Sequence, residues 1–117
     1  MIIPKKIRIG SCDYDVDFTE DNIVVNGSHC KAAIAYDDHV ISIDTKLGDA
    51  QQRELSFLHE MFHGIVNERN VEFEDEELVV EELAKGLHQV IRDNQGMFTN
   101  EPYPMNNEVN VYVQATE

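Results

Sequence analysis

The chain has 117 residues, of which 42% are hydrophobic, and this fits one soluble domain with a modest core. Nine basic against 23 acidic residues give a net charge of −14, so we expect neither direct nucleic-acid binding nor attachment to an anionic membrane surface. No apolar run approaches the roughly 20 residues that span a bilayer, and the N-terminal segment has no small-residue cleavage site, so we expect a cytoplasmic protein.

Residues 1–48 are expected to form mainly β-structure. From Cys12 to Phe18 apolar side chains alternate with aspartates, which predicts a strand with one wet face. Cys12 and Cys30 form no Cys-x-x-Cys pair and sit where small apolar residues fit a strand, so we expect free thiols. Asp37-Asp38 predicts a turn between the last two strands. The shorter apolar segments predict strands at 7–9, 23–25, 32–36 and 39–44.

Two helices are expected in residues 49–95. Apolar residues recur at helical spacing over 50–67, and Asp49 precedes them as an N-cap. A second helix starts near Asp75, and Gly96 is positioned to end it with a left-handed cap.

The last segment, residues 96–117, is expected to be a tail or an edge strand, because residues 108–113 alternate in polarity. The whole chain, 1–117, is therefore predicted to be one α+β domain.

The first helix carries the sequence His59-Glu60-Met61-Phe62-His63. Residues four apart lie on one helix face, so both imidazoles can reach one zinc ion at about 2.0–2.1 Å. Glu60 is placed to take a proton from a water that attacks a carbonyl, as the general base of a zinc peptidase. The motif therefore predicts a zinc cofactor with His59 and His63 as ligands and Glu60 as the catalytic residue. The alternative is a helix surface with two ordinary histidines.

A helical wheel places these residues relative to the core. The apolar stripe of the first helix is centred near Leu55, Leu58 and Phe62, and the two histidines fall at one edge of it. Glu60 falls further round, towards solvent. This arrangement is typical of a site that lines a cleft beside a core.

A catalytic zinc site needs a third protein ligand, and the acidic segment 75–82 offers several carboxylates. Glu81 and Glu82 flank the apolar stripe of the second helix on opposite sides, so periodicity does not choose between them. Ala84 and His88 share a face with Glu81, and the small side chain of Ala84 would leave room for a metal. This favours Glu81, with His88 as a further polar group of the site.

The other polar candidates are weaker. Tyr36 or Tyr103 would supply a hydroxyl to stabilise an oxyanion, although nothing in the sequence favours this role over packing. His29 and His39 lie in the β region, where we expect exposed histidines without a site.

Roughly residues 35–94 resemble the small phage and prophage zinc peptidase-like proteins, which are similar to the ImmA/IrrE metallo-endopeptidase family. The resemblance implies a zincin-like fold, in which a small antiparallel or mixed sheet packs on the active-site helix and a second helix carries a glutamate ligand. That ligand would be Glu81, and Glu60 would be the general base. The matching segments are Val40-Ile41-Ser42-Ile43-Asp44, Gln51-Gln52-Arg53-Glu54, Leu58-His59-Glu60-Met61-Phe62-His63-Gly64, Val79-Val80-Glu81-Glu82-Leu83-Ala84-Lys85-Gly86-Leu87 and Val90-Ile91-Arg92-Asp93-Asn94.

Two functions follow from this sequence. The first is a zinc-dependent metallopeptidase, phage or prophage encoded, that hydrolyses peptide bonds of an intracellular protein. The second is a catalytically weak or inactive zinc-binding module that presents its carboxylates to a basic partner. The presence of Glu60 favours the enzyme, because a zinc scaffold alone does not need it.

Overall fold

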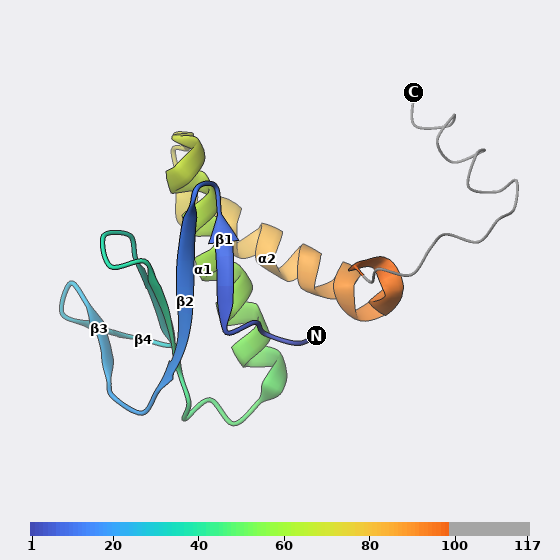
Figure 1. Cartoon of the computed structure of the whole chain (residues 1–117), viewed down its shortest axis with the longest axis horizontal. Coiled ribbons are helices and arrows are strands. Elements are labelled where there is room, and N and C mark those ends of the chain that lie inside the picture. Colours follow the sequence, from blue (N-terminus) through green and yellow to red (C-terminus); the bar gives the residue numbers. More distant parts are fainter. Residues whose placement is uncertain (99–117) are drawn as a thin grey trace, which may run out of the picture.

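The computed structural model describes residues 1–98, and the strand predicted at 108–113 and Tyr103 lie outside the described residues (Figure 1). These described residues form an α+β domain, in which six short strands are followed by two long helices and then by a short 3₁₀ helix. In chain order the elements are β1 (Lys6–Ile9), β2 (Cys12–Thr19), β3 (Ile23–Val25), β4 (Ser28–Cys30), β5 (Ala32–Ala35), β6 (Val40–Asp44), α1 (Ala50–Arg69), α2 (Glu76–Asp93) and η1 (Gln95–Phe98).

The main sheet has four strands in the order β1-β2-β6-β5. β1 pairs with β2 and β5 pairs with β6 in antiparallel fashion, whereas β2 and β6 are parallel, with Val16 opposite Ile41. The sheet is therefore mixed, one of the two arrangements that the sequence predicted. β5 forms one edge of this sheet and packs against α1.

Within residues 1–98 each predicted strand is present, and one further strand, β4, was not predicted. Asn26 and Gly27 both adopt positive φ angles, 52° and 80°, which allows a tight turn between β3 and β4. The three residues of β4 carry no clear alternation, so only pairing with β3 reveals them. Both cysteines, at the ends of β2 and β4, are free thiols as expected.

The N-caps of both helices follow the prediction, whereas the two C-terminal ends differ from it. Asp49 accepts a hydrogen bond from the Gln51 N–H (2.9 Å), and Asp75 accepts one from the Leu78 N–H (3.1 Å). α1 runs two residues past the predicted end, to an Asn70 C-cap with φ 56°. The prediction that Gly96 forms a left-handed cap is wrong, because the chain continues into η1 and Gly96 lies inside it without a positive φ.

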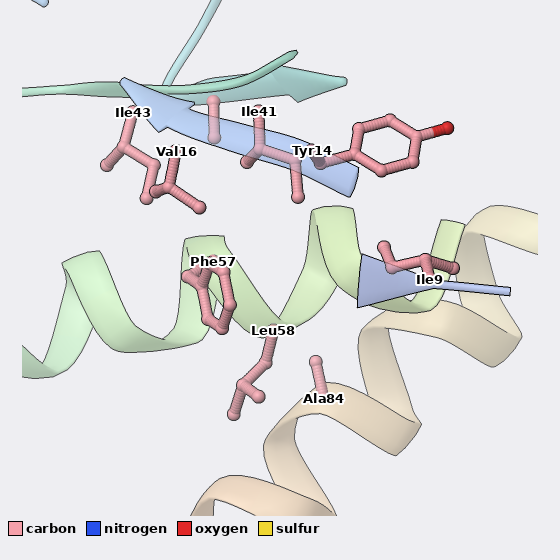
Figure 2. Close-up of a cluster of buried hydrophobic side chains, with 9 residues drawn as sticks. Ile9, Tyr14, Val16, Ile41, Ile43, Phe57, Leu58 and Ala84 are labelled. Atoms are coloured by element: carbon pink, nitrogen blue, oxygen red, sulfur yellow. The ribbon is translucent and has the colours of Figure 1, made fainter. Parts of the chain in front are cut away.

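The core lies between the sheet and α1, and α2 packs on the other side of α1 (Figure 2). Ile41 and Ile43 of β6 are fully buried and point from the sheet towards α1, whereas Leu58 points from α1 towards Ala84 of α2. Ala84 brings α2 into the same cluster. Among residues 1–98, neither helix combines the length and apolar composition that crossing a bilayer requires.

One glycine sets how closely α1 approaches the sheet. A Cβ on Gly64 would lie 2.9 Å from Cδ1 of Ile9 and 3.0 Å from Cδ1 of Ile34, closer than side chains pack. The absence of a side chain therefore lets the second half of α1 lie directly against β5. This contact places His63, the preceding residue, beside the sheet edge.

Candidate metal centre

Two histidines and one glutamate converge where α1 and α2 lie side by side. His59 and His63 are one turn apart on α1, and Glu77 comes from the first turn of α2. One ligand atom of each residue can be chosen so that all three atoms lie within 4.8 Å of one another. These residues are the only group of three potential metal ligands among residues 1–98.

The distances within this group suit a small metal ion. The two Nε2 atoms of His59 and His63 are 3.1 Å apart, and Nε2 of His63 lies 2.7 Å from Oε1 of Glu77. Nε2 of His59 lies 3.3 Å from the other oxygen of Glu77. A tetrahedral zinc ion with bonds of about 2.0–2.1 Å separates its ligands by about 3.3 Å. With one oxygen of Glu77 as the ligand, the three donor atoms span up to 4.8 Å, so changes of about 1.5 Å or less in their separations would let them hold zinc.

The outer nitrogens of both histidines face carboxylates from α2. Oε2 of Glu76 lies 2.6 Å from Nδ1 of His63, and Oε1 of Glu81 lies 3.5 Å from Nδ1 of His59. A carboxylate only accepts hydrogen bonds, so each one favours the tautomer with the proton on Nδ1. Both Nε2 lone pairs then point at each other and at Glu77. Three converging acceptors repel one another unless a cation, either a proton or a metal, lies between them.

The third member of the group differs from the sequence prediction. Glu81 stands behind His59, against its outer nitrogen, whereas Glu77 faces both inner nitrogens. The connection between the helices is short, so the first turn of α2 lies beside the last turns of α1. Glu82 is exposed and pairs with Lys85 at 3.5 Å, away from the histidines. Glu77 lies in the first turn of α2, where a negative charge is favourable in any helix, so no local signal in the sequence distinguishes a second role for it.

His88 is not part of this group. It is 5% exposed and its Nε2 lies 2.7 Å from Oε1 of Glu54, so it forms a buried polar contact between the two helices. His29 and His39 are exposed, as the sequence predicted.

Glu60 lines a pocket beside the three candidate ligands. Burial raises the pKa of this carboxyl group above its ordinary value, whereas the charges of His59 and His63 act in the opposite direction and that of Glu77 raises it. The helical wheel had placed Glu60 towards solvent, and this prediction is wrong. β5 packs along that flank of α1 and covers it, which a wheel of one isolated helix does not represent.

Tyr36 follows β5 and lines the same pocket. Its hydroxyl donates a hydrogen bond to the main-chain carbonyl of His63 (3.4 Å). Burial, with the nearby charges of Glu76 and Glu60, raises the pKa of Tyr36 to about 12. The hydroxyl is therefore protonated at neutral pH, and it would donate to a bound molecule by giving up its long hydrogen bond to the His63 carbonyl.

The protonation of His63 is set by opposing effects. Burial acts to lower the pKa of His63, but the hydrogen bond to Glu76 and the charges of Glu77 and Glu60 outweigh it and raise the pKa above the ordinary value. A site that attracts a proton in this way also attracts a metal cation, and the two compete for the same Nε2 lone pair.

The pocket occupies about 620 Å³ between β5, α1 and α2. Comparisons of the chain with models of protein families, with curated proteins and with solved structures gave no match. The function is therefore inferred from the geometry and chemistry of this site.

Proposed function

We propose that the chain is a zinc-dependent peptidase with a zincin-like fold. His59, His63 and Glu77 hold the metal, and Glu60 is the general base. The observation that carries the proposal is the convergence of three acceptor atoms beside a partly buried carboxylate. A site that only stored zinc would not need that carboxylate.

Zinc fits the donor set better than other common metals. Two imidazoles and one carboxylate are the ligands of many catalytic zinc sites, which keep a fourth position open for water or substrate. Calcium and magnesium prefer a shell made of oxygen atoms alone. When bound, zinc would polarise a substrate carbonyl and lower the pKa of a water molecule towards neutrality.

The protein's own groups then complete the reaction. Glu60 accepts the proton of the attacking water, and its raised pKa suits it to hold that proton and pass it to the leaving amine. Tyr36 is the candidate donor to the oxygen that gains charge, since its hydroxyl is protonated and lines the same pocket. Glu76 and Glu81 orient the two histidines from behind.

The free edge of β5 supports a peptide as the substrate. The Asp44 N–H donates a hydrogen bond to the Lys31 carbonyl (2.9 Å). From this pair onward, antiparallel partners of β5 and β6 alternate between hydrogen-bonded and non-hydrogen-bonded pairs. Ala32 and Ile34 therefore turn their backbone N–H and C=O groups away from β6.

No strand among residues 1–98 pairs with that edge, and both residues line the pocket. An extended peptide would add to β5 as a further strand beside the metal group. The motif resemblance to the ImmA/IrrE family supports the same class of substrate.

The test separates metal binding from catalysis. The purified protein is dialysed against trace zinc, and its metal content and its cleavage of a protein substrate are measured. We expect about one zinc per chain in the wild type and in Glu60→Gln, with cleavage lost in Glu60→Gln alone. Glu82→Gln, which removes a carboxylate outside the pocket, is the matched control and should keep both properties. A wild-type protein without retained zinc would refute the proposal.

A second candidate function is a zinc-binding module that presents its acidic surface to a basic partner. The exposed carboxylates of Glu72, Glu74, Asp75 and Glu82 near the start of α2 favour it. In that case zinc would remain bound, Glu60→Gln would leave function intact, and charge reversal at these positions would abolish it.

A further inference from the structure

The pocket continues along α1 beyond the metal group and changes its chemical character. At one end it is lined by the candidate ligands and Glu60, and at the other by Lys31 and Lys85 with the neutral polar side chains of Gln52 and Ser56. The chain has only nine basic residues against 23 acidic ones. Two of those nine at one end of the pocket, one beside β5 and one on α2, therefore form a local reversal of the overall charge.

The antiparallel packing of the helices fixes how far Lys85 lies from the metal group. Glu77, Glu81 and Lys85 follow one another at four-residue intervals and share one face of α2. Lys85 lies eight residues beyond Glu77, or about 12 Å along the helix axis. An extended peptide, at about 3.3 Å per residue, covers that distance in roughly three to four residues.

Both lysines are available to a ligand. Lys85 contacts Glu82 at 3.5 Å, but both side chains are more than half exposed, and an exposed ion pair of this kind contributes little stability. Lys31 is exposed and forms no ion pair with any residue in the described range 1–98. A substrate carboxylate between the two lysines would meet their charges at contact distance. Glu82, which contacts Lys85, and Glu81, one turn away on the same face of α2, oppose this attraction, whereas charges further away are screened by salt over about 8–10 Å.

We propose that the Lys31–Lys85 end of the pocket binds a carboxylate of the peptide substrate, about three residues from the cleaved bond. This inference rests on the proposed peptidase function and specifies its substrate class. The carboxylate is supplied either by an aspartate or glutamate side chain or by the C-terminus of a short peptide.

The side of the cleaved bond follows from the direction of β5. β5 runs from the lysine end of the pocket, at Ala32, towards Tyr36 beside His63. A peptide that adds to β5 in antiparallel fashion, the more stable pairing, runs the opposite way. Residues after the cleaved bond therefore reach the lysine end, and the recognised carboxylate lies on the C-terminal side.

The experiment compares peptides that differ only in the position of one negative charge. A glutamate is placed at each of the first five positions after the cleaved bond, with glutamine in its place as the reference, and each peptide has either a free or an amidated C-terminus. Cleavage is measured with the zinc-loaded full chain, and binding is measured with zinc-loaded Glu60→Gln. For a carboxylate near the third position we expect tighter binding and about tenfold higher kcat/KM, with the gain arising from a lower KM. A preference that follows the amidation state identifies the C-terminus as the source.

Charge-reversed variants then assign the preference to the pocket. Lys85→Glu and Lys31→Glu should remove it, whereas Arg92→Glu, the same change on an exposed site of α2 outside the pocket, should keep it. Circular dichroism and zinc content verify that each variant is folded. Equal preference in the wild type and in both lysine variants would overturn the inference while leaving the peptidase function in place. If no peptide is cleaved but Glu60→Gln still binds acidic peptides through Lys85, the peptidase proposal fails, and only carboxylate binding at the lysine end of the pocket is retained.

Discussion

Replacing the carboxylates of α2 one at a time distinguishes a metal ligand from a group that orients a ligand. Glu77 lies 2.7 Å and 3.3 Å from the two inner histidine nitrogens, whereas Glu76 and Glu81 contact only the outer ones. Loss of a carboxylate behind a metal-bound histidine typically weakens metal binding by about 10- to 100-fold. Loss of a ligand itself should exceed that range.

We therefore expect Glu77→Gln to lower zinc affinity by more than about 100-fold, and Glu76→Gln and Glu81→Gln by about 10- to 100-fold each. Glu76 should have the larger effect of those two, because its 2.6 Å contact is a hydrogen bond whereas the 3.5 Å contact of Glu81 is an ion pair only.

The assay is competition for zinc against a chromophoric chelator at constant pH, with Glu82→Gln as the control that keeps wild-type affinity. A larger loss in Glu81→Gln than in Glu77→Gln would show that Glu81 is the ligand and that the assignment from these distances is wrong.

Three further predictions concern protonation, packing and capping. The pKa of His63 in the folded protein is raised above its ordinary value of about 6.5. Its proton therefore stabilises the metal-free protein, and this stabilisation is complete below about pH 6.5 and is lost as pH rises through the folded-state pKa. The same proton competes with zinc, so zinc affinity measured by chelator competition should fall as pH is lowered through that pKa; an affinity independent of pH would contradict this. Gly64→Ala should lower the free energy of unfolding by about 1 kcal/mol in urea titration, since overpacking outweighs the gain in helix propensity. Gly86→Ala, whose Cβ meets open space in α2, should raise it by up to about 1 kcal/mol, and equal effects at the two glycines would refute the packing argument. Asp75→Ala and Asp49→Ala each remove an N-cap and should cost about 1 kcal/mol in the same titration, but only Asp75→Ala, beside Glu76 and Glu77, should also weaken zinc binding.

The sequence by itself determined the features that depend on neighbouring residues. The alternation from Cys12 to Phe18 specifies a strand, and Asp49 and Asp75 mark two helix starts, because strand period and capping act within a few residues. The four-residue spacing of His59 and His63 likewise fixes their common face before any tertiary contact forms. These local rules were enough to predict the α+β class, two helices and the pair of histidines.

The tertiary structure decided what depends on the alignment of one element with another. Which carboxylate of α2 faces the inner histidine nitrogens is set by the packing of two helices, so Glu77 occupies the position that the sequence favoured for Glu81, one turn along the same face. The burial of Glu60 comes from β5, a strand that is distant in the sequence, and the buried partner of His88 is Glu54 on the other helix. Helical periodicity describes a face of one helix and contains no information about the neighbour that covers it, which is why these features emerge only when the chain is folded.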